Sequence, residues 1–579
     1  MKCRILRLCF LSVLCTSVVN AFSLDREAFT FTSYDLNVRV EPEQQRLGVR
    51  GKITLRNDSQ IPQKVAVLQI SSSLDWRSIK AGGKQLQFVS QPYTSDIDHT
   101  GALSEAVVTL PEAVQPKGTI DLEIAYEGIV VLDATRLTRI GTPESTAHST
   151  DWDQISPKFT AVRGVGYVTW YPIATEAADI SEGMNLFDVL GRWKAREADS
   201  PMHLQVAVSS SDDANQPEFL VNATTCPTAQ EAQQQFVADC TYRSLGSVVP
   251  TLIVANYEVL DRTAIAVHFL RGHDASAANY ADAAGKMIPF ISEWFGTPRG
   301  KAETADLTDP NAAPFESGPL LLTPLTSTDP KLAGLVAAHQ LTHAAFSSPR
   351  PWINEGLAHF AQALYLEHQS GRQSALDYMG LHRSAFSVAE GEKGKQATAP
   401  RSEDEANRSL INTYDEEFYR SKAMCVWWML RNMVGDQALK KAIASYHPEQ
   451  DKEPSYMPRL IAAQTQKDLE WFFDDWVYRD RGLPDFKVAS AFTRKTLPEG
   501  YMVTITIDNL GAAGGEVPIT VKFAGGEVTK RLVVRGKSNG VIRVEVPKPP
   551  EEIVVNDGSV PENNETNNVF KIDQSETAK

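Results

Sequence analysis

The spacing of hydrophobic residues changes twice along this 579-residue chain, and this limits what the chain can fold into. In residues 34–57 and 119–131 polar and apolar side chains alternate with period two, as they do in half-buried strands. From about residue 261 the apolar residues recur at helical spacing, and after 482–484 short alternating runs return. The chain therefore needs strand-rich and helical domains in succession.

We predict a multidomain α+β protein, because a chain of this length exceeds what one hydrophobic core supports. Residues 26–258 are predicted to form a β-rich N-terminal domain, a large antiparallel one. Residues 261–484 are predicted to form a mostly helical domain, and 485–579 a small Ig-like β-sandwich. Hydrophobic residues make up 42% of the chain and charged residues 22%, which is ordinary for folded domains and argues against general disorder.

Residues 1–21 have the layout of a secretory signal peptide. Three basic residues precede an apolar run over 8–19, and small residues end at Ala21. The run is shorter than the ~20 residues that a membrane-spanning helix needs, which favours a cleaved signal over the alternative, a membrane anchor. No later segment is apolar and long enough to span a bilayer. We expect an exported protein, either secreted or periplasmic.

The cysteines agree with export. Three of the six lie within residues 1–21 and would leave with the signal. Cys226 and Cys240 bracket a polar stretch and would form a disulfide in an oxidising compartment; the alternative is a pair of buried thiols on neighbouring strands. Cys425 lies among large apolar residues and is expected in the core.

The segment "HQLTHAAFSSPRPWINEGLAHF", residues 339–360, is the strongest candidate for chemistry. His339 and His343 are four apart on a predicted helix, so they share one face, with Cβ atoms about 5–6 Å apart. Glu355 follows on the next predicted helix after a proline-bearing turn. Two histidines and a carboxylate that leave a fourth position open are typical of catalytic zinc. The alternatives are ordinary core or surface histidines and a glutamate that the helix dipole favours.

In "HQLTH" and "PWINEG" the chain resembles the aminopeptidase N-type zinc peptidases, which are gluzincins. Their motif is H-E-x-x-H, followed by a glutamate in a W-x-N-E-G-x-A setting. The resemblance implies zinc as the cofactor, with His339, His343 and Glu355 as ligands. It also implies a β-rich N-terminal domain, a helical catalytic domain and, in many members, a later β-sandwich. Eleven residues, 344–354, separate the second histidine from the glutamate, fewer than is usual in the family.

Two further site residues are implied by looser matches. Glu316 precedes His339 by twenty-three residues and corresponds to the family's glutamate that binds the substrate's N-terminal amine; otherwise it is a surface charge on a loop. Tyr419 corresponds to the tyrosine that supports the tetrahedral intermediate; otherwise it is a core aromatic. The expected partners are therefore peptide or protein N-termini. A net charge of −15 without a basic stripe argues against nucleic acid.

Gln340 occupies the position at which the family has its general base. An amide cannot be deprotonated near neutral pH, so it can only hydrogen-bond the water that zinc activates. General acid–base catalysis typically contributes about 10²–10⁴-fold, so hydrolysis should be weak or lost. Zinc binding should survive, because Gln340 is not a ligand. We also expect Gln340→Glu to restore part of the activity.

Three functions remain open from the sequence. The first is a zinc-bound pseudopeptidase that holds peptide N-termini. The second is a slow or repurposed hydrolase in which Glu316 replaces the base. The third is a non-enzymatic extracellular peptide-binding or adhesion protein, whose helical domain is only structural and binds no metal.

Overall fold

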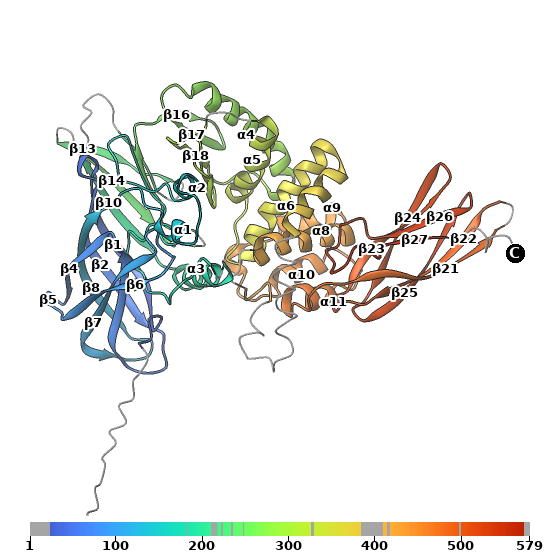
Figure 1. Ribbon diagram of the computed structural model, residues 1–579, viewed down its shortest axis with the longest axis horizontal. Helices are drawn as coiled ribbons and strands as arrows, with labels where there is room; N and C mark the ends of the chain where they lie inside the picture. Colours follow the sequence, from blue (N-terminus) through green and yellow to red (C-terminus); the bar gives the residue numbers. More distant parts are fainter. Residues whose placement is uncertain are drawn as a thin grey trace, which may run out of the picture.

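The computed structural model shows a strand-rich part, a helical part and a second strand-rich part in succession (Figure 1). This arrangement confirms the predicted multidomain α+β architecture. The predicted signal segment, 1–21, lies outside the described residues. The structure describes residues 24–572 except 182, 210–216, 222–223, 233–234, 247, 326–328, 384–408, 414–416 and 497–498.

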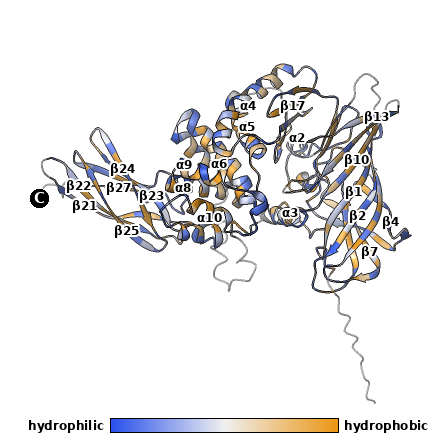
Figure 2. Ribbon diagram, turned by 180° about the vertical axis from the view of Figure 1, so that it is seen from behind, coloured by the Kyte–Doolittle hydropathy of each residue, from blue (hydrophilic) through white to orange (hydrophobic). Residues whose placement is uncertain are grey.

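The N-terminal part is built on an eight-stranded sheet with the order β13-β14-β10-β1-β2-β8-β4-β5. Hydrophobic and hydrophilic residues alternate along its long strands (Figure 2), and in β1 and β10 buried positions alternate with more exposed ones. The pair β1–β10 is parallel, so the prediction of an antiparallel domain is wrong at this pair. The strands are β1 (Phe29–Glu41), β2 (Arg46–Asn57), β4 (Leu74–Ala81), β5 (Lys84–Gln85), β8 (Thr119–Ile129), β10 (Met202–Ser209), β13 (Thr228–Ala232) and β14 (Gln235–Tyr242).

Two smaller sheets and several helices complete this part. The order is β3-β7-β6 in one sheet and β12-β11-β15-β9 in the other. The helices were not predicted, because each is short or lies between strands. The elements are β3 (Gln63–Ser71), β6 (Phe88–Thr94), β7 (Ala102–Val114), β9 (Phe159–Val162), β11 (Glu218–Val221), β12 (Thr224–Thr225), β15 (Leu252–Ala255), α1 (Thr135–Arg139), α2 (Glu144–Thr150), α3 (Gly183–Glu197) and the 3₁₀ turn η1 (Pro42–Gln44).

Cys226 and Cys240 form a disulfide, with Cα atoms 5.3 Å apart. Cys240 lies on β14 of the eight-stranded sheet, and Cys226 directly follows β12 of the four-stranded sheet. The bond therefore links two sheets. Cys425 is a buried free thiol, as predicted from its apolar neighbours.

The middle part contains a five-stranded sheet that the sequence analysis did not predict, with the order β16-β17-β18-β20-β19. The strands β17, β18 and β20 are parallel neighbours. Parallel strands are covered on both faces, so their sequences lack the alternation that marks a half-exposed strand. Leu321 belongs to the hydrophobic core of the helices, whereas Leu320 and Leu322 belong to the core of the N-terminal part. The strands are β16 (Glu258–Asp261), β17 (Ile265–Phe269), β18 (Ala302–Asp306), β19 (Phe315–Ser317) and β20 (Leu320–Thr323).

Helices pack against one side of this sheet, and α5 and α6 form a hairpin within them (Figure 1). The side chain of Asp329 accepts a hydrogen bond from Lys331 N and so caps the start of α5. None of the helices in the described part of the chain is long and apolar enough to cross a membrane. The helices are α4 (Asp274–Phe295), α5 (Pro330–Ala345), α6 (Pro351–Ser370), a helical stretch over 372–383, η3 (Glu417–Lys422), α8 (Ala423–Val434), α9 (Asp436–Ala444), η4 (Pro448–Gln450), α10 (Tyr456–Ala462), α11 (Glu470–Phe473) and η5 (Asp474–Tyr478).

The C-terminal part consists of two sheets, ordered β21-β22-β25 and β24-β23-β26-β27. Their inward side chains belong to the same hydrophobic core as the helices. Trp476 Nε1 donates to Gly514 O at 2.8 Å, and Gly514 N donates to Asp475 Oδ2 at 2.9 Å. The sandwich is therefore fixed to the helical part. Its strands are β21 (Phe486–Lys495), β22 (Tyr501–Asn509), β23 (Gly515–Phe523), β24 (Gly526–Val534), β25 (Ser538–Val546), β26 (Pro550–Val555) and β27 (Val569–Lys571).

We predict that Gly356→Ala destabilises the protein, because a Cβ at Gly356 would lie 2.7 Å from Ala423 Cβ and 3.0 Å from Trp427 Nε1. Forcing α6 away from α8 should lower the free energy of unfolding by roughly 1–3 kcal/mol, measured by urea denaturation. Gly285→Ala is the matched control, since nothing lies within 4 Å of a Cβ there. It should leave stability unchanged or raise it by up to about 1 kcal/mol. Equal effects of the two substitutions would contradict the close approach of α6 and α8.

Candidate metal centre

Two helices bring the three predicted ligands together. His339 and His343 lie one turn apart on α5, with Nε2 atoms 3.2 Å from each other. Glu355 lies in the second turn of α6, with Oε1 3.5 Å from His343 Nε2 and Oε2 3.9 Å from His339 Nε2. Tetrahedral zinc with bonds of about 2.0–2.2 Å needs ligand atoms about 3.4 Å apart. The set therefore fits a zinc ion.

The turn between α5 and α6 determines where Glu355 lies. The helix α5 ends at Ala345, and Pro351 starts α6 at a position where its missing N–H costs nothing. Asn354 of the "NEG" motif accepts a hydrogen bond from Ser348 N at 3.0 Å. This bond fixes the entry to α6, so Glu355 faces the two histidines.

The surroundings favour the protonation states that metal binding requires. Burial lowers the pKa of His339, because the interior disfavours the charged imidazole. Burial alone would raise the pKa of Glu355, but His343, Arg420 and His339 outweigh it and hold that pKa well below its usual range. A neutral imidazole and an ionised carboxylate are the forms that bind a metal ion.

Glu316 and Tyr419, the two looser predictions, both line the cleft beside the metal centre. Glu316 lies on β19, with Oε2 3.5 Å from His339 Nε2, and its side chain is 34% exposed. Tyr419 lies in η3 and is almost wholly buried. The cleft has a volume of about 270 Å³ and is also lined by residues of α3. The fold thus brings together residues that are far apart in sequence.

Gln340 does not face the metal centre; its amide is bonded into the sheet. Nε2 donates to Glu303 O at 2.8 Å and to Pro319 O at 2.9 Å, and Oε1 accepts from Tyr280 Oη at 2.8 Å. Backbone carbonyls only accept hydrogen bonds, so the orientation of the amide is fixed. The side chain is buried, and both of its donors are engaged. The prediction that this amide hydrogen-bonds a water at the metal is therefore wrong.

The structure adds two site residues that the sequence analysis missed. His359 lies one turn after Glu355, with its ring centroid 4.9 Å from that of His339. Neither of its ring nitrogens has a hydrogen-bond partner in the described part of the chain, and burial lowers its pKa well below the usual range. Spacing on α6 could have identified it. Arg420 Nε lies 3.4 Å from Glu355 Oε2, a contact that no local pattern predicts.

The N-terminal part holds the segment that carries Glu316. Trp152 Nε1 donates to Ala313 O at 3.0 Å, and the ring of Tyr167 packs edge-on against Phe315 with centroids 5.3 Å apart. These contacts lie within a few residues of Glu316. The N-terminal part therefore holds one wall of the cleft in place.

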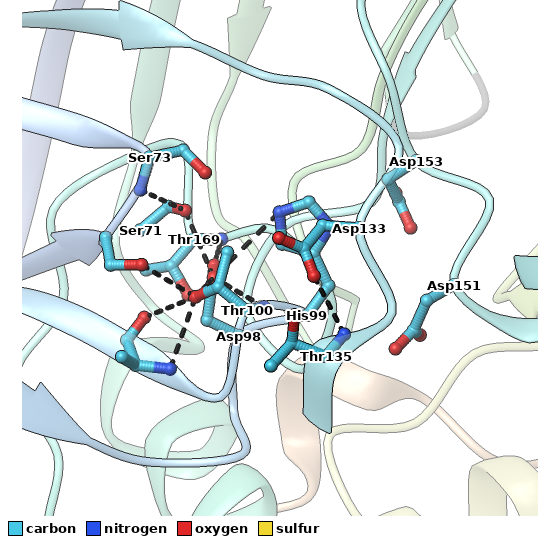
Figure 3. A network of polar contacts seen from close by, with 12 residues as sticks. Ser71, Ser73, Asp98, His99, Thr100, Asp133, Thr135, Asp151, Asp153 and Thr169 are labelled. Carbon is cyan, nitrogen blue, oxygen red and sulfur yellow. Dashed lines mark hydrogen bonds and ion pairs between the residues drawn. The ribbon is translucent and has the colours of Figure 1, made fainter. Parts of the chain in front are cut away.

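A buried polar network around Asp98 fixes the loop that carries Thr169 (Figure 3), and Tyr167 lies two residues before Thr169 in the chain. Asp98 accepts from Ser71 Oγ at 3.1 Å, from Thr100 Oγ1 at 2.7 Å and from Thr169 N at 2.9 Å. The backbone of His99 donates to Tyr167 O at 2.6 Å. Asp98 thus stabilises the loop by accepting hydrogen bonds from donors on several segments.

Comparison with known proteins identifies the helical part. Residues 331–476 match the model of the peptidase family M1 domain, which confirms the resemblance found in "HQLTH" and "PWINEG". No curated protein matches the chain. The M1 zinc metallopeptidase from Deinococcus radiodurans is similar in structure, with 17% identity, 79% of this chain and 96% of that chain covered, and a TM-score of 0.46. Its glutamate-to-alanine mutant bound to a Tyr-Ser-Ala substrate gives 18% identity, the same coverage and a TM-score of 0.47.

We predict that the purified protein contains one zinc ion per chain and that His343→Ala loses most of it, because two of the three ligands then remain. Gln340→Ala should keep its zinc but lower the free energy of unfolding by roughly 1–3 kcal/mol, because it leaves buried carbonyls without donors. Metal analysis of the two variants, together with urea denaturation, checks both statements. Full zinc retention in His343→Ala would exclude the ligand assignment.

Proposed function

We propose that this chain, whose residues 331–476 match a peptidase family M1 domain, is an exported zinc-binding protein that holds peptide N-termini and hydrolyses them weakly or not at all. The observation that carries the proposal is the state of Gln340. The metal ligands and the cleft are present, whereas the position of the base is occupied by an amide bonded inside the sheet.

The missing step is proton transfer. Bound zinc would supply a water of lowered pKa to such a site. A peptidase needs a side chain that accepts this water's proton and delivers it to the leaving amine. Gln340 has no acidic proton to exchange, and its two N–H groups donate to Glu303 O and Pro319 O. It therefore acts as a packing residue between α5 and the sheet.

The cleft retains features that favour binding of a peptide N-terminus. Glu316 offers a one-third exposed carboxylate to a protonated amine. Tyr419 lines the same cavity, within the space that a bound peptide would fill. Neither contact needs a base, so binding survives where hydrolysis does not. Export is supported by the layout of residues 1–21 and by a disulfide, which persists in oxidising compartments.

A slow hydrolase is the second candidate, favoured by the position of Glu316. Its Oε2 lies 3.5 Å from His339 Nε2, on the side of the metal centre that the cleft opens to. A carboxylate at that distance from a ligand could take a proton from a water at the metal. In that case Glu316 would act as the base, and Gln340 would be irrelevant to the rate.

We predict that Gln340→Glu does not restore hydrolysis. A carboxylate there would face Glu303 O and Pro319 O, so it would stay protonated or turn away and leave both carbonyls unpaired. This replaces the expectation from sequence that the substitution restores activity. Hydrolysis of aminoacyl amides should rise far less than the roughly 10²–10⁴-fold typical of a general base. Gln340→Met, of similar size, is the control. A gain of a hundredfold or more with zinc still bound would refute the structural role.

Glu316→Gln separates the two candidate functions. If the protein only binds peptides, the wild type hydrolyses aminoacyl amides at a rate near that of the zinc-free protein, and Glu316→Gln weakens peptide binding by loss of the carboxylate. If Glu316 is the base, hydrolysis that chelation abolishes will be measurable in the wild type and will fall at least about a hundredfold in Glu316→Gln. We expect the first result, from titration calorimetry and amide hydrolysis on the same samples.

A further inference from the structure

We propose that the cleft ends in an anion-binding site at Arg350, which accepts a carboxylate of the bound peptide. The carboxylate is either the C-terminus of a short peptide or an acidic side chain. This inference rests on the proposed function and deepens it, because it names the class of ligand. It concerns a residue that the family motif does not include.

Arg350 lies at the entrance to α6, directly before Pro351, and lines the same cavity as Glu316 and Glu355. Its side chain is 18% exposed. A guanidinium is expensive to bury without partners. An arginine kept largely buried at the wall of a cleft therefore needs a reason for its position.

A closed circuit of hydrogen bonds fixes this arginine. Its backbone N donates to Ser348 Oγ at 3.1 Å, and Ser348 Oγ lies 2.7 Å from Tyr446 Oη. Tyr446 donates to Asp451 Oδ2 at 2.6 Å, so the hydrogen between the two hydroxyls belongs to Ser348. Asp451 in turn accepts from Arg350 Nε at 2.7 Å. The circuit begins and ends on one residue and holds its side chain in one orientation.

The chemistry of the circuit keeps it intact at neutral pH. Burial, together with the bond to Asp451, raises the pKa of Tyr446, so the phenol stays protonated and keeps donating. The side chain of Asp451 is fully buried and accepts two hydrogen bonds, one from the guanidinium of Arg350 and one from the phenol of Tyr446. Arginine remains charged throughout. The guanidinium is therefore positioned before any ligand arrives, which lowers the cost of binding.

Only Nε of the guanidinium is used by the circuit. No described residue accepts a hydrogen bond from the Nη atoms of Arg350. These two nitrogens form the part of the fork that matches both oxygens of a carboxylate. The cavity is also lined by Lys194 and Arg420, together with Glu316 and Glu355. The unused donors favour an anionic group on the ligand.

The size of the site limits the length of the ligand. A volume of about 270 Å³ falls just below the roughly 300–1,000 Å³ of drug-sized pockets. Arg350 and Glu355 are five residues apart at the start of α6, about 7.5 Å along its axis. An extended peptide covers roughly 3.3–3.6 Å per residue, so about two residues separate the metal centre from the arginine. Peptides of two or three residues could then have their amine near Glu316 and their carboxylate at Arg350.

A purely structural role for Arg350, as a tie between the turn and Asp451, makes a different prediction. Loss of such a tie would weaken the binding of every peptide alike, through a loosened turn and a displaced Glu355. An anion site instead distinguishes peptides that differ only in one charge. The test therefore compares matched ligands on the same protein.

The experiment measures the binding of trialanine and of its C-terminal amide to the zinc-loaded full-length mature protein by titration calorimetry. We expect the free acid to bind roughly 10–100-fold more tightly than the amide, the range for a hydrogen-bonded charged group. In Arg350→Gln this ratio should fall to about one, because loss of the Arg350–Asp451 tie affects the acid and the amide alike and only the acid loses its charged partner. Arg350→Lys should give an intermediate ratio, because the charge remains and the fork is lost. If Arg350→Gln does not fold, the acid-to-amide affinity ratio of Arg350→Lys tests the proposal.

Matched controls separate the possible outcomes. Arg271→Gln removes the same charge from an exposed site, where the side chain is 81% exposed, and should leave the ratio unchanged. The pair Ala-Glu-Ala amide and Ala-Gln-Ala amide tests the other source: a preference for glutamate that Arg350→Gln abolishes assigns the site to acidic side chains. An acid-to-amide or glutamate-to-glutamine preference that persists in Arg350→Gln and Arg350→Lys overturns the proposal, as does the absence of both preferences in the wild type. If no peptide binds at all, the proposed function itself fails.

Discussion

The architecture of the site depends on the burial of α5. From residue 337 to 342 every residue of this helix is buried, so each polar side chain on it must find a partner inside the protein. Thr342 bonds back to Ala338 O at 2.7 Å. His339 faces Glu355 on α6, and Gln340 turns to the sheet and to Tyr280 on α4. The helix α5 thus carries the two histidines on one face and the tie to the sheet on another.

The same constraint gives the His339, His343 and Glu355 cluster a structural role. Glu355 is a nearly buried carboxylate, and removal of its partners would leave an uncompensated charge, which costs several kcal/mol. The two histidines lie within 4 Å of that carboxylate and join α5 to α6, and a metal ion held by the three side chains would add to this tie. At the next position, the amide of Gln340 ties α5 to the sheet instead.

The sequence predicted the features that depend on local interactions and missed those that depend on contacts between segments far apart in the chain. The positions of His339, His343 and Glu355 follow from helix periodicity and a short turn, which are local. The partners of Gln340 come from α4, β18 and the residue before β20, and no local pattern connects them. The five-stranded sheet was missed for a different reason: its parallel strands β17, β18 and β20 are covered on both sides, so their sequences lack the alternation of a half-exposed strand.

That sheet has a consequence for the movement of the molecule. Side chains of β18 and β20 belong to two hydrophobic cores, one on each face, so neither core can swing away from the other without exposing apolar surface to water. Glu316 extends from this shared layer, and the turn that carries Arg350 is packed on the helices beyond it. Hinge closure of whole domains around a ligand is therefore disfavoured. A ligand therefore has to fit the cleft of about 270 Å³ as the two packed cores leave it.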